Sequence, residues 1–184
     1  LRALGGEWFS DTPLPIGDKR LTFGEIICLA GDFYAHLDDQ AVHDFASAWP
    51  PLGGFTNWIA DEPYTVTLEN DSAQNVTELL SIIQNDKDKD QGSASEFTSY
   101  AFGTGRNNHT ARRYIALATA NHCHFASPKP GWSEKTNEAL QLYRAYHGRA
   151  IREAQAASSS SQGIKSLHQA LATDAFGCHF LSDL

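Results

Sequence analysis

The chain has 184 residues, of which 41% are hydrophobic and 11% aromatic, and this is enough apolar surface for one compact core. Its formal net charge of −8 argues against a nucleic-acid backbone as an electrostatic partner. No apolar run approaches the ~18 residues that a membrane-spanning helix needs, so no transmembrane segment is expected.

Three sequence features bear on the compartment. The chain contains no methionine, even at position 1, so we expect a processed mature form whose targeting segment has been removed. Glycan-acceptor triplets begin at Asn70, Asn75 and Asn108 and predict a secreted, extracellular glycoprotein, although such triplets also arise by chance. The cysteines lie in apolar stretches and allow either one internal disulfide or buried free thiols; they are Cys28, Cys123 and Cys178.

The first predicted elements are an irregular N-terminal arm over residues 1–20 and a helix that follows it. Thr22-Phe23-Gly24-Glu25 has the pattern of a capping box, and the helix that it opens should run to about His36. On that helix Glu25, Asp32 and His36 would share one stripe, because they stand at positions i, i+7 and i+11. An exposed alternation of charges is the other interpretation of this stripe.

Two helices and a short extended segment are predicted in the middle of the chain. A short helix over residues 40–48 should end at the Trp-Pro-Pro sequence of residues 49–51. Residues 64–67 are typical of a brief extended segment, and residues 72–85 of an amphipathic helix.

The remaining helices carry most of the histidines. A helix over about 110–125 ends in Asn-His-Cys-His-Phe, where the histidines at 122 and 124 cannot share a face. A longer helix over 133–157 should bury a stripe that places His147 on the apolar side; its members are Leu140, Tyr143, His147, Ile151 and Ala154. A hydrogen-bonded core histidine is the alternative to a metal ligand there.

The last helix, predicted over residues 163–184 after a serine-rich joint, carries His179 and Asp183. These residues are four apart and therefore stack on one helical face, with apolar residues between them. Burying either side chain without a partner is costly, so a metal ion or a mutual hydrogen bond is expected. Five or six helices with little strand predict an all-α fold, a single multi-helix bundle domain over residues 1–184.

Several of these helices offer an imidazole or a carboxylate to a common point. Zinc takes nitrogen and oxygen ligands of this kind, and bundle cores hold metals on side chains from separate helices. No HExxH motif, no Gly-x-Ser-x-Gly elbow and no Glu-x-x-His pair is present. The candidate ligands are Glu25, Asp32, His36, His122 or His124, His147, His168, His179 and Asp183.

The segments Asn121–Phe125 and His179–Asp183 together resemble the zinc-dependent phospholipase C / P1 nuclease superfamily. The resemblance implies that His124, His179 and Asp183 bind metal, with Asp183 bridging two ions, and that Asp32 in Gly31-Asp32-Phe33-Tyr34 is the early aspartate ligand. It implies a secreted metal-dependent phosphodiester hydrolase in which Asp32 and Asp183 are the catalytic residues and zinc ions, of unknown number, activate a water molecule. The expected partner is a phosphodiester or phospholipid substrate.

The chain departs from the family pattern at both ends. It stops at Leu184, before the family's next histidine and last ligand pair, and position 1 is Leu where the family has a metal-binding Trp. We therefore expect either a C-terminal continuation or second chain that completes the site, or a molecule that binds one metal. The alternative functions are a non-catalytic secreted helical module that binds lipid or protein, and a metal-binding oxidoreductase.

Overall fold

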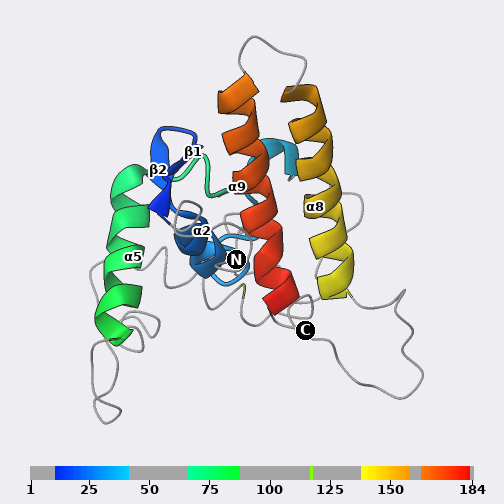
Figure 1. Cartoon of the computed structure of the whole chain (residues 1–184). Helices are drawn as coiled ribbons and strands as arrows, with labels where there is room; N and C mark the ends of the chain where they lie inside the picture. The colour runs from blue at the N-terminus through cyan, green and yellow to red at the C-terminus, as the bar shows by residue number, and fades with distance from the viewer. Residues whose placement is uncertain (1–10, 42–65, 88–116, 118–137, 158–162, 183–184) are drawn as a thin grey trace, which may run out of the picture. The chain divides into compact units, whose positions relative to one another are not determined.

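The computed structural model describes residues 11–41, 66–87, 117, 138–157 and 163–182 (Figure 1). The chain forms two compact units. The first unit combines residues 1–31 with residues 121–184, and the second unit is residues 32–120. The expectation of one domain over residues 1–184 stays a prediction.

The first unit opens with a β-hairpin, where the sequence predicted an irregular arm. Strand β1 (Leu14–Ile16) pairs antiparallel with β2 (Lys19–Leu21), with Leu14 opposite Leu21. The two-residue turn is made by Gly17, at φ 58°, and Asp18. Glycine adopts positive φ without a Cβ penalty, and this turn length suits a hairpin. The arm prediction, made for residues 1–20, is therefore wrong for residues 14–20, because prolines at 13 and 15 conceal the strand pattern.

Helix α2 (Phe23–Leu29) begins at the predicted capping box. The Thr22 hydroxyl oxygen accepts the Glu25 backbone N–H at 3.3 Å, and the Glu25 carboxylate accepts the Thr22 backbone N–H at 2.7 Å. The helix ends at Leu29, with an extended residue at 30 and Gly31 at φ 73°. The prediction that it continues to His36 is wrong, because the left-handed glycine turns the chain away.

Helices α8 (Glu138–Ala157) and α9 (Gly163–Ser182) run side by side in opposite directions (Figure 1). The side of α8 that is buried is not the predicted one. Its buried positions are Ala139, Leu142, Tyr146, Ala150 and Ala157. The predicted stripe is instead half-buried or exposed, with Ile151 45% exposed and the His147 side chain 44% exposed. Two apolar stripes exist on α8, and the periodicity alone does not tell which one α9 covers.

Helix α9 is the centre of the first unit, since it packs against α8, α2 and β1. The rings of Phe176 and Phe180 contact Tyr146 of α8, with centroids 5.0 and 6.2 Å away. All three residues are at most 1% exposed. A polar link supplements this cluster, because the Thr173 hydroxyl donates to the Glu153 carboxylate at 2.7 Å.

The second unit contains helix α5 (Ala73–Lys87), which lies within two residues of the predicted bounds at both ends. Ser72 precedes the helix and accepts the Asn75 N–H on its hydroxyl at 3.2 Å, the role of an N-cap. Val76 and Leu79 form the buried face of α5.

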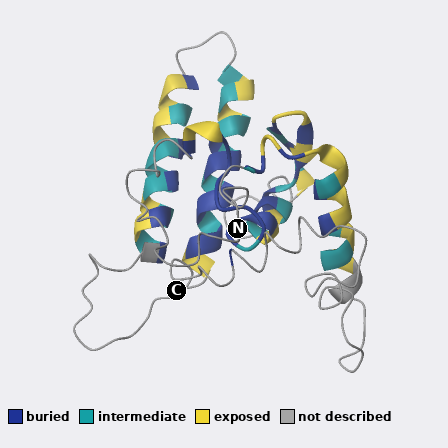
Figure 2. Ribbon diagram, turned by 180° about the vertical axis from the view of Figure 1, so that it is seen from behind, coloured by how far each residue is buried: buried dark blue, intermediate teal, exposed yellow. Residues whose placement is uncertain are grey.

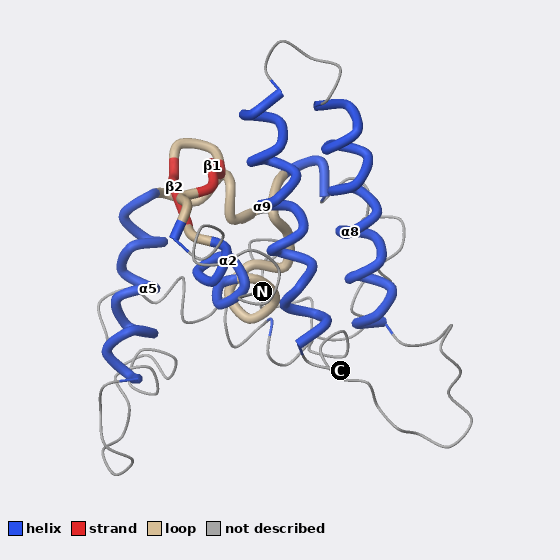
Figure 3. The backbone as a smooth tube through the Cα atoms, in the orientation of Figure 1, coloured by secondary structure: helices blue, strands red, loops and turns tan. Residues whose placement is uncertain are grey.

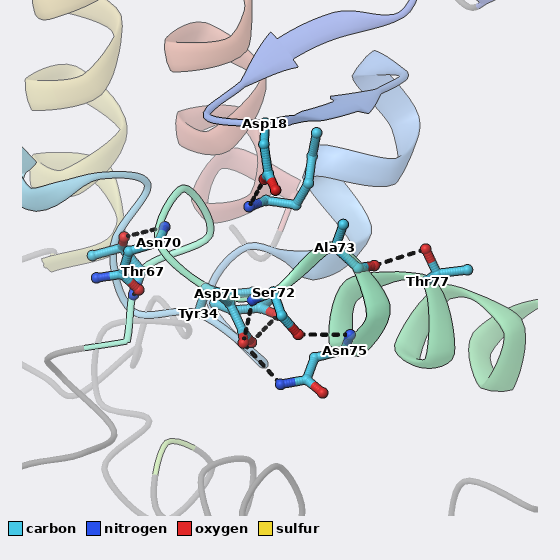
Figure 4. A network of polar contacts seen from close by, with 10 residues as sticks. Asp18, Tyr34, Thr67, Asn70, Asp71, Ser72, Ala73, Asn75 and Thr77 are labelled. Carbon is cyan, nitrogen blue, oxygen red and sulfur yellow. Dashed lines mark hydrogen bonds and ion pairs between the residues drawn. The ribbon is translucent and has the colours of Figure 1, made fainter.

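Polar contacts fix the chain in front of α5 (Figure 4). The Tyr34 hydroxyl donates to the buried Asp71 carboxylate at 2.7 Å, and the Asn75 side-chain amide donates to the other oxygen at 2.9 Å. Thr67 and Asn70 exchange two side chain–backbone hydrogen bonds, of 2.9 and 3.1 Å, which close the turn between them.

The described part of the chain is mainly helical, with one two-stranded sheet, and this confirms the all-α prediction (Figure 3). No described helix is long and apolar enough to cross a membrane. Of the predicted helix 40–48 only residues 40–41 are described, and they are helical, as is residue 117 within the predicted helix 110–125. The rest of these two helices, and residues 64–65 and 133–137, lie outside the described residues.

Candidate functional site

His179 is the best-defined of the predicted ligands. It lies in α9, is only 7% exposed, and contacts the ring of Phe180 edge-on. Its Nδ1 lies 3.0 Å from the backbone carbonyl oxygen of Ile27 in α2. Because a carbonyl only accepts, Nδ1 carries the proton in the neutral ring and Nε2 carries the lone pair. This is the tautomer in which a protein histidine binds a metal through Nε2.

His147 is oriented in the same way by a different acceptor. Its Nδ1 lies 2.7 Å from the Asp174 carboxylate, which joins α8 to α9. The ring of Tyr143 stacks on the imidazole at a centroid distance of 5.3 Å. The two side chains of the pair are 44% and 29% exposed, so the pair is accessible to solvent. A carboxylate that is hydrogen-bonded to a histidine fixes the tautomer and the orientation of the ring.

The thiol of Cys178 lies close to this pair. Burial and then the negative charge of Asp174 raise the pKa of Cys178 to about 11. Burial, Asp174 and Cys178 also raise the pKa of the Tyr143 hydroxyl. The thiolate is the form that binds metal and attacks substrates, so a protonated Cys178 does neither. Cys178 and Cys28 are both free thiols; Cys28 is exposed, which corrects the expectation of a buried residue, and Cys123 lies outside the described residues.

The predicted stripe of Glu25, Asp32 and His36 does not form, because α2 ends before its second and third members. The Glu25 carboxylate is part of the capping box, where Oε2 accepts hydrogen bonds from the Thr22 backbone N–H and hydroxyl at 2.7 and 3.0 Å. Asp32 lies half-buried in the turn after Gly31 and belongs, with His36, to the second unit.

His36 is a buried histidine, 5% exposed, in a segment outside any helix. Its backbone carbonyl accepts the Leu68 N–H at 3.1 Å, and Leu37 likewise accepts the Glu69 N–H at 2.9 Å. Burial lowers the pKa of its imidazole to about 4, against a smaller raising effect of the Asp38 charge. His36 is therefore neutral at pH 7.

The remaining predicted ligands, His122, His124 and Asp183, lie outside the described residues. The shared ion of His124, His179 and Asp183 therefore stays a prediction. Within the described ranges, no three His, Cys, Asp or Glu side chains come together in a way that could hold a metal.

Sequence reasoning missed Asp174. A signal existed, because Asp174 is the one charged residue in the run from Ala170 to Phe180. A carboxylate in such a run needs a partner, and the facing helix α8 offers His147. The pairing depends on how the two helices are aligned, which the sequence does not state.

Three comparisons with known proteins identify no relative of the chain. No protein-family description, curated protein or solved structure matches it.

Proposed function

We propose that this protein is a zinc-dependent hydrolase of phosphodiesters, with a phospholipid as the first choice of substrate. The observation that supports this most is the orientation of His179. It is a buried imidazole with Nδ1 held by a backbone carbonyl, within the His-x-x-x-Asp sequence that the resemblance marks as metal-binding.

The chemistry of the side chains fits a zinc ion. Neutral imidazole and carboxylate are the ligands that zinc takes in hydrolytic sites, and the ligands proposed within the first unit are His124, His179 and Asp183. When bound, the ion would lower the pKa of a water molecule and polarise a phosphoryl oxygen. The chain's own contribution is orientation: the Ile27 carbonyl fixes the His179 ring, and α2 is held in place by its cap.

The test replaces His179 with Gln and compares it with His168→Gln. Losing an outer-shell partner costs 10–100-fold in metal affinity or activity, so losing the ligand itself should lower bound zinc and turnover of a chromogenic phosphodiester by at least about 100-fold. His168, a candidate ligand of the sequence that is not in the proposed set, lies on the same helix and is half-buried, so its replacement controls for a change in α9. Circular dichroism of both variants checks the helix content.

Two results would contradict the proposal. One is a purified wild-type protein with no transition metal by elemental analysis and no turnover that a chelator abolishes. The other is a His179→Gln variant that keeps both metal and turnover. Iron or copper in the same analysis would point to the oxidoreductase alternative, and lipid binding without turnover to the non-catalytic module.

A further inference from the structure

The connected ends of α8 and α9 expose large apolar side chains to solvent. Ile164 is 75% exposed, and Ile151 and Leu167 are each 45% exposed. Figure 2 shows exposed positions in yellow on both helices next to their connection. Scattered single apolar residues are normal on protein surfaces, whereas neighbouring ones mark a contact surface.

These side chains lie towards the same side of the helix pair. Ile151 follows His147 by four residues on α8, and Leu167 precedes Asp174 by seven on α9, so each shares a helical face with a member of the His147–Asp174 pair. Because the His147–Asp174 pair joins the two helices, the face of α8 that carries Ile151 and the face of α9 that carries Leu167 lie on the same side of the helix pair. Ile164 extends the surface by one turn along α9.

Positive charge accompanies this apolar surface. Arg152 adjoins Ile151, and Lys165 adjoins Ile164; both are exposed. Of the acids on these two helices, Glu153 accepts from Arg149 at 2.7 Å and Asp174 is paired with His147, while Glu138 stands at the first position of α8, the end away from this surface. In a chain of net charge −8, the described exposed residues from 151 to 167 include no acid.

We propose that this surface, formed by Ile151, Arg152, Ile164, Lys165 and Leu167, docks the protein on an anionic lipid bilayer. The apolar side chains would enter the boundary between headgroups and acyl chains. The long stems of the arginine and the lysine would lie along the apolar layer with their charges among the lipid phosphates. The inference rests on the exposed face of the first unit and holds whether or not the proposed hydrolase activity is present.

The composition of the surface favours lipid over a protein partner. The centres of protein interfaces are enriched in aromatic residues and poor in charge, whereas this surface has no aromatic among its described members and sets two basic residues among isoleucine and leucine. Basic residues flanking apolar ones are typical of helices that bind the surface of anionic membranes.

The test is sedimentation of the full chain with lipid vesicles of phosphatidylcholine, alone or with about 30% phosphatidylserine. The wild type should bind the anionic vesicles at least about tenfold more tightly than the neutral ones. Lys165→Gln should weaken that binding about fivefold, and Ile164→Ser with Leu167→Ser should abolish most of it. All of these side chains are exposed, so the fold should tolerate the changes.

Matched controls remove the same groups elsewhere. Arg20→Gln takes one exposed positive charge from β2, and Leu181→Ser takes an exposed leucine from the opposite end of α9; neither should reduce vesicle binding.

Equal binding of wild type and the double serine variant would overturn the proposal. A dimer in solution that only the double variant loses would also overturn it and assign the surface to a second copy. Turnover of a soluble phosphodiester should be the same in wild type and double variant, which separates this proposal from the hydrolase.

Discussion

At the scale of single residues, Gly177 decides how closely α9 approaches α8. A Cβ added there would stand 2.6 Å from the Cβ of Tyr146 and 3.6 Å from the Tyr143 carbonyl oxygen. Carbon atoms do not approach so closely, so either the helix or the tyrosine would have to move. The aromatic cluster around Tyr146 depends on this absence of a side chain.

Gly177→Ala should therefore destabilise the protein by about 1–3 kcal/mol, because the overpacking outweighs the better helix propensity of alanine. Gly148→Ala is the matched control on α8, where the nearest atom to the added Cβ is the end of the Arg152 side chain at 3.6 Å. That change should be neutral or stabilise by up to ~1 kcal/mol. Urea unfolding measures both, and an equal effect of the two changes would show that the helices do not meet at Gly177.

At the scale of elements, the capping box places α2 and, through it, the Ile27 carbonyl that holds His179. The sequence predicts the start of this helix because the capping box is a local pattern: its two members, Thr22 and Glu25, lie within four consecutive residues. It does not predict the end, because Leu29-Ala30-Gly31 continues the helical pattern, whereas in the structure Ala30 is extended and Gly31 is left-handed. The buried stripe of α8 was missed for a related reason: it depends on α9, a partner far along the chain.

Thr22→Ala should destabilise the first unit by about 1 kcal/mol, the usual cost of removing an N-cap hydroxyl. Thr22→Ser keeps the hydroxyl and should leave the free energy of unfolding about unchanged, because serine caps a helix at least as well as threonine. If the proposed metal site is present, the alanine variant should also bind zinc less tightly, since α2 holds the acceptor of His179. Chemical denaturation and a zinc titration test the two effects separately, and equal stability of both variants would exclude a capping role.

At the scale of the whole molecule, the two units share an all-α character that the sequence predicts well. Helix α5 and the ends of α8 and α9 follow from apolar periodicity and from serine and glycine boundaries. The separation of Asp32 from α2 was not predicted, because it depends on which contacts the chain makes after residue 31. Of the candidate site, the burial of His179 was predicted, and its carbonyl partner in α2 was not.

The buried His36 should make the second unit sensitive to acid. Its folded pKa, about 4, lies below the ordinary 6.5, so an unfolded chain binds a proton between these values while the folded one does not. The contribution of His36 to the free energy of unfolding is therefore fully present above pH 6.5. It is lost as the pH falls towards 4, by on the order of 2–3 kcal/mol.

The measurement is the free energy of unfolding at about pH 7.5 and about pH 4.5 for wild type and His36→Gln. Carboxylates contribute the same pH dependence to both proteins, so the difference between the two losses isolates the histidine. The wild type should lose more stability than the variant on acidification. Identical losses would mean that His36 is protonated in the folded protein.

The first unit joins segments that are far apart in the sequence, residues 1–31 and 121–184, and this has a consequence for its biosynthesis. The bond between His179 and Ile27 spans 152 residues. At a translation rate of 5–20 residues per second, the N-terminal hairpin and α2 wait roughly 8–30 s on the ribosome before α9 emerges. Throughout that interval Leu14, Ile16 and Ile26, which are at most 3% exposed in the finished fold, lack the helix that will cover them. A nascent chain of this kind is a natural client for chaperones that shield apolar segments.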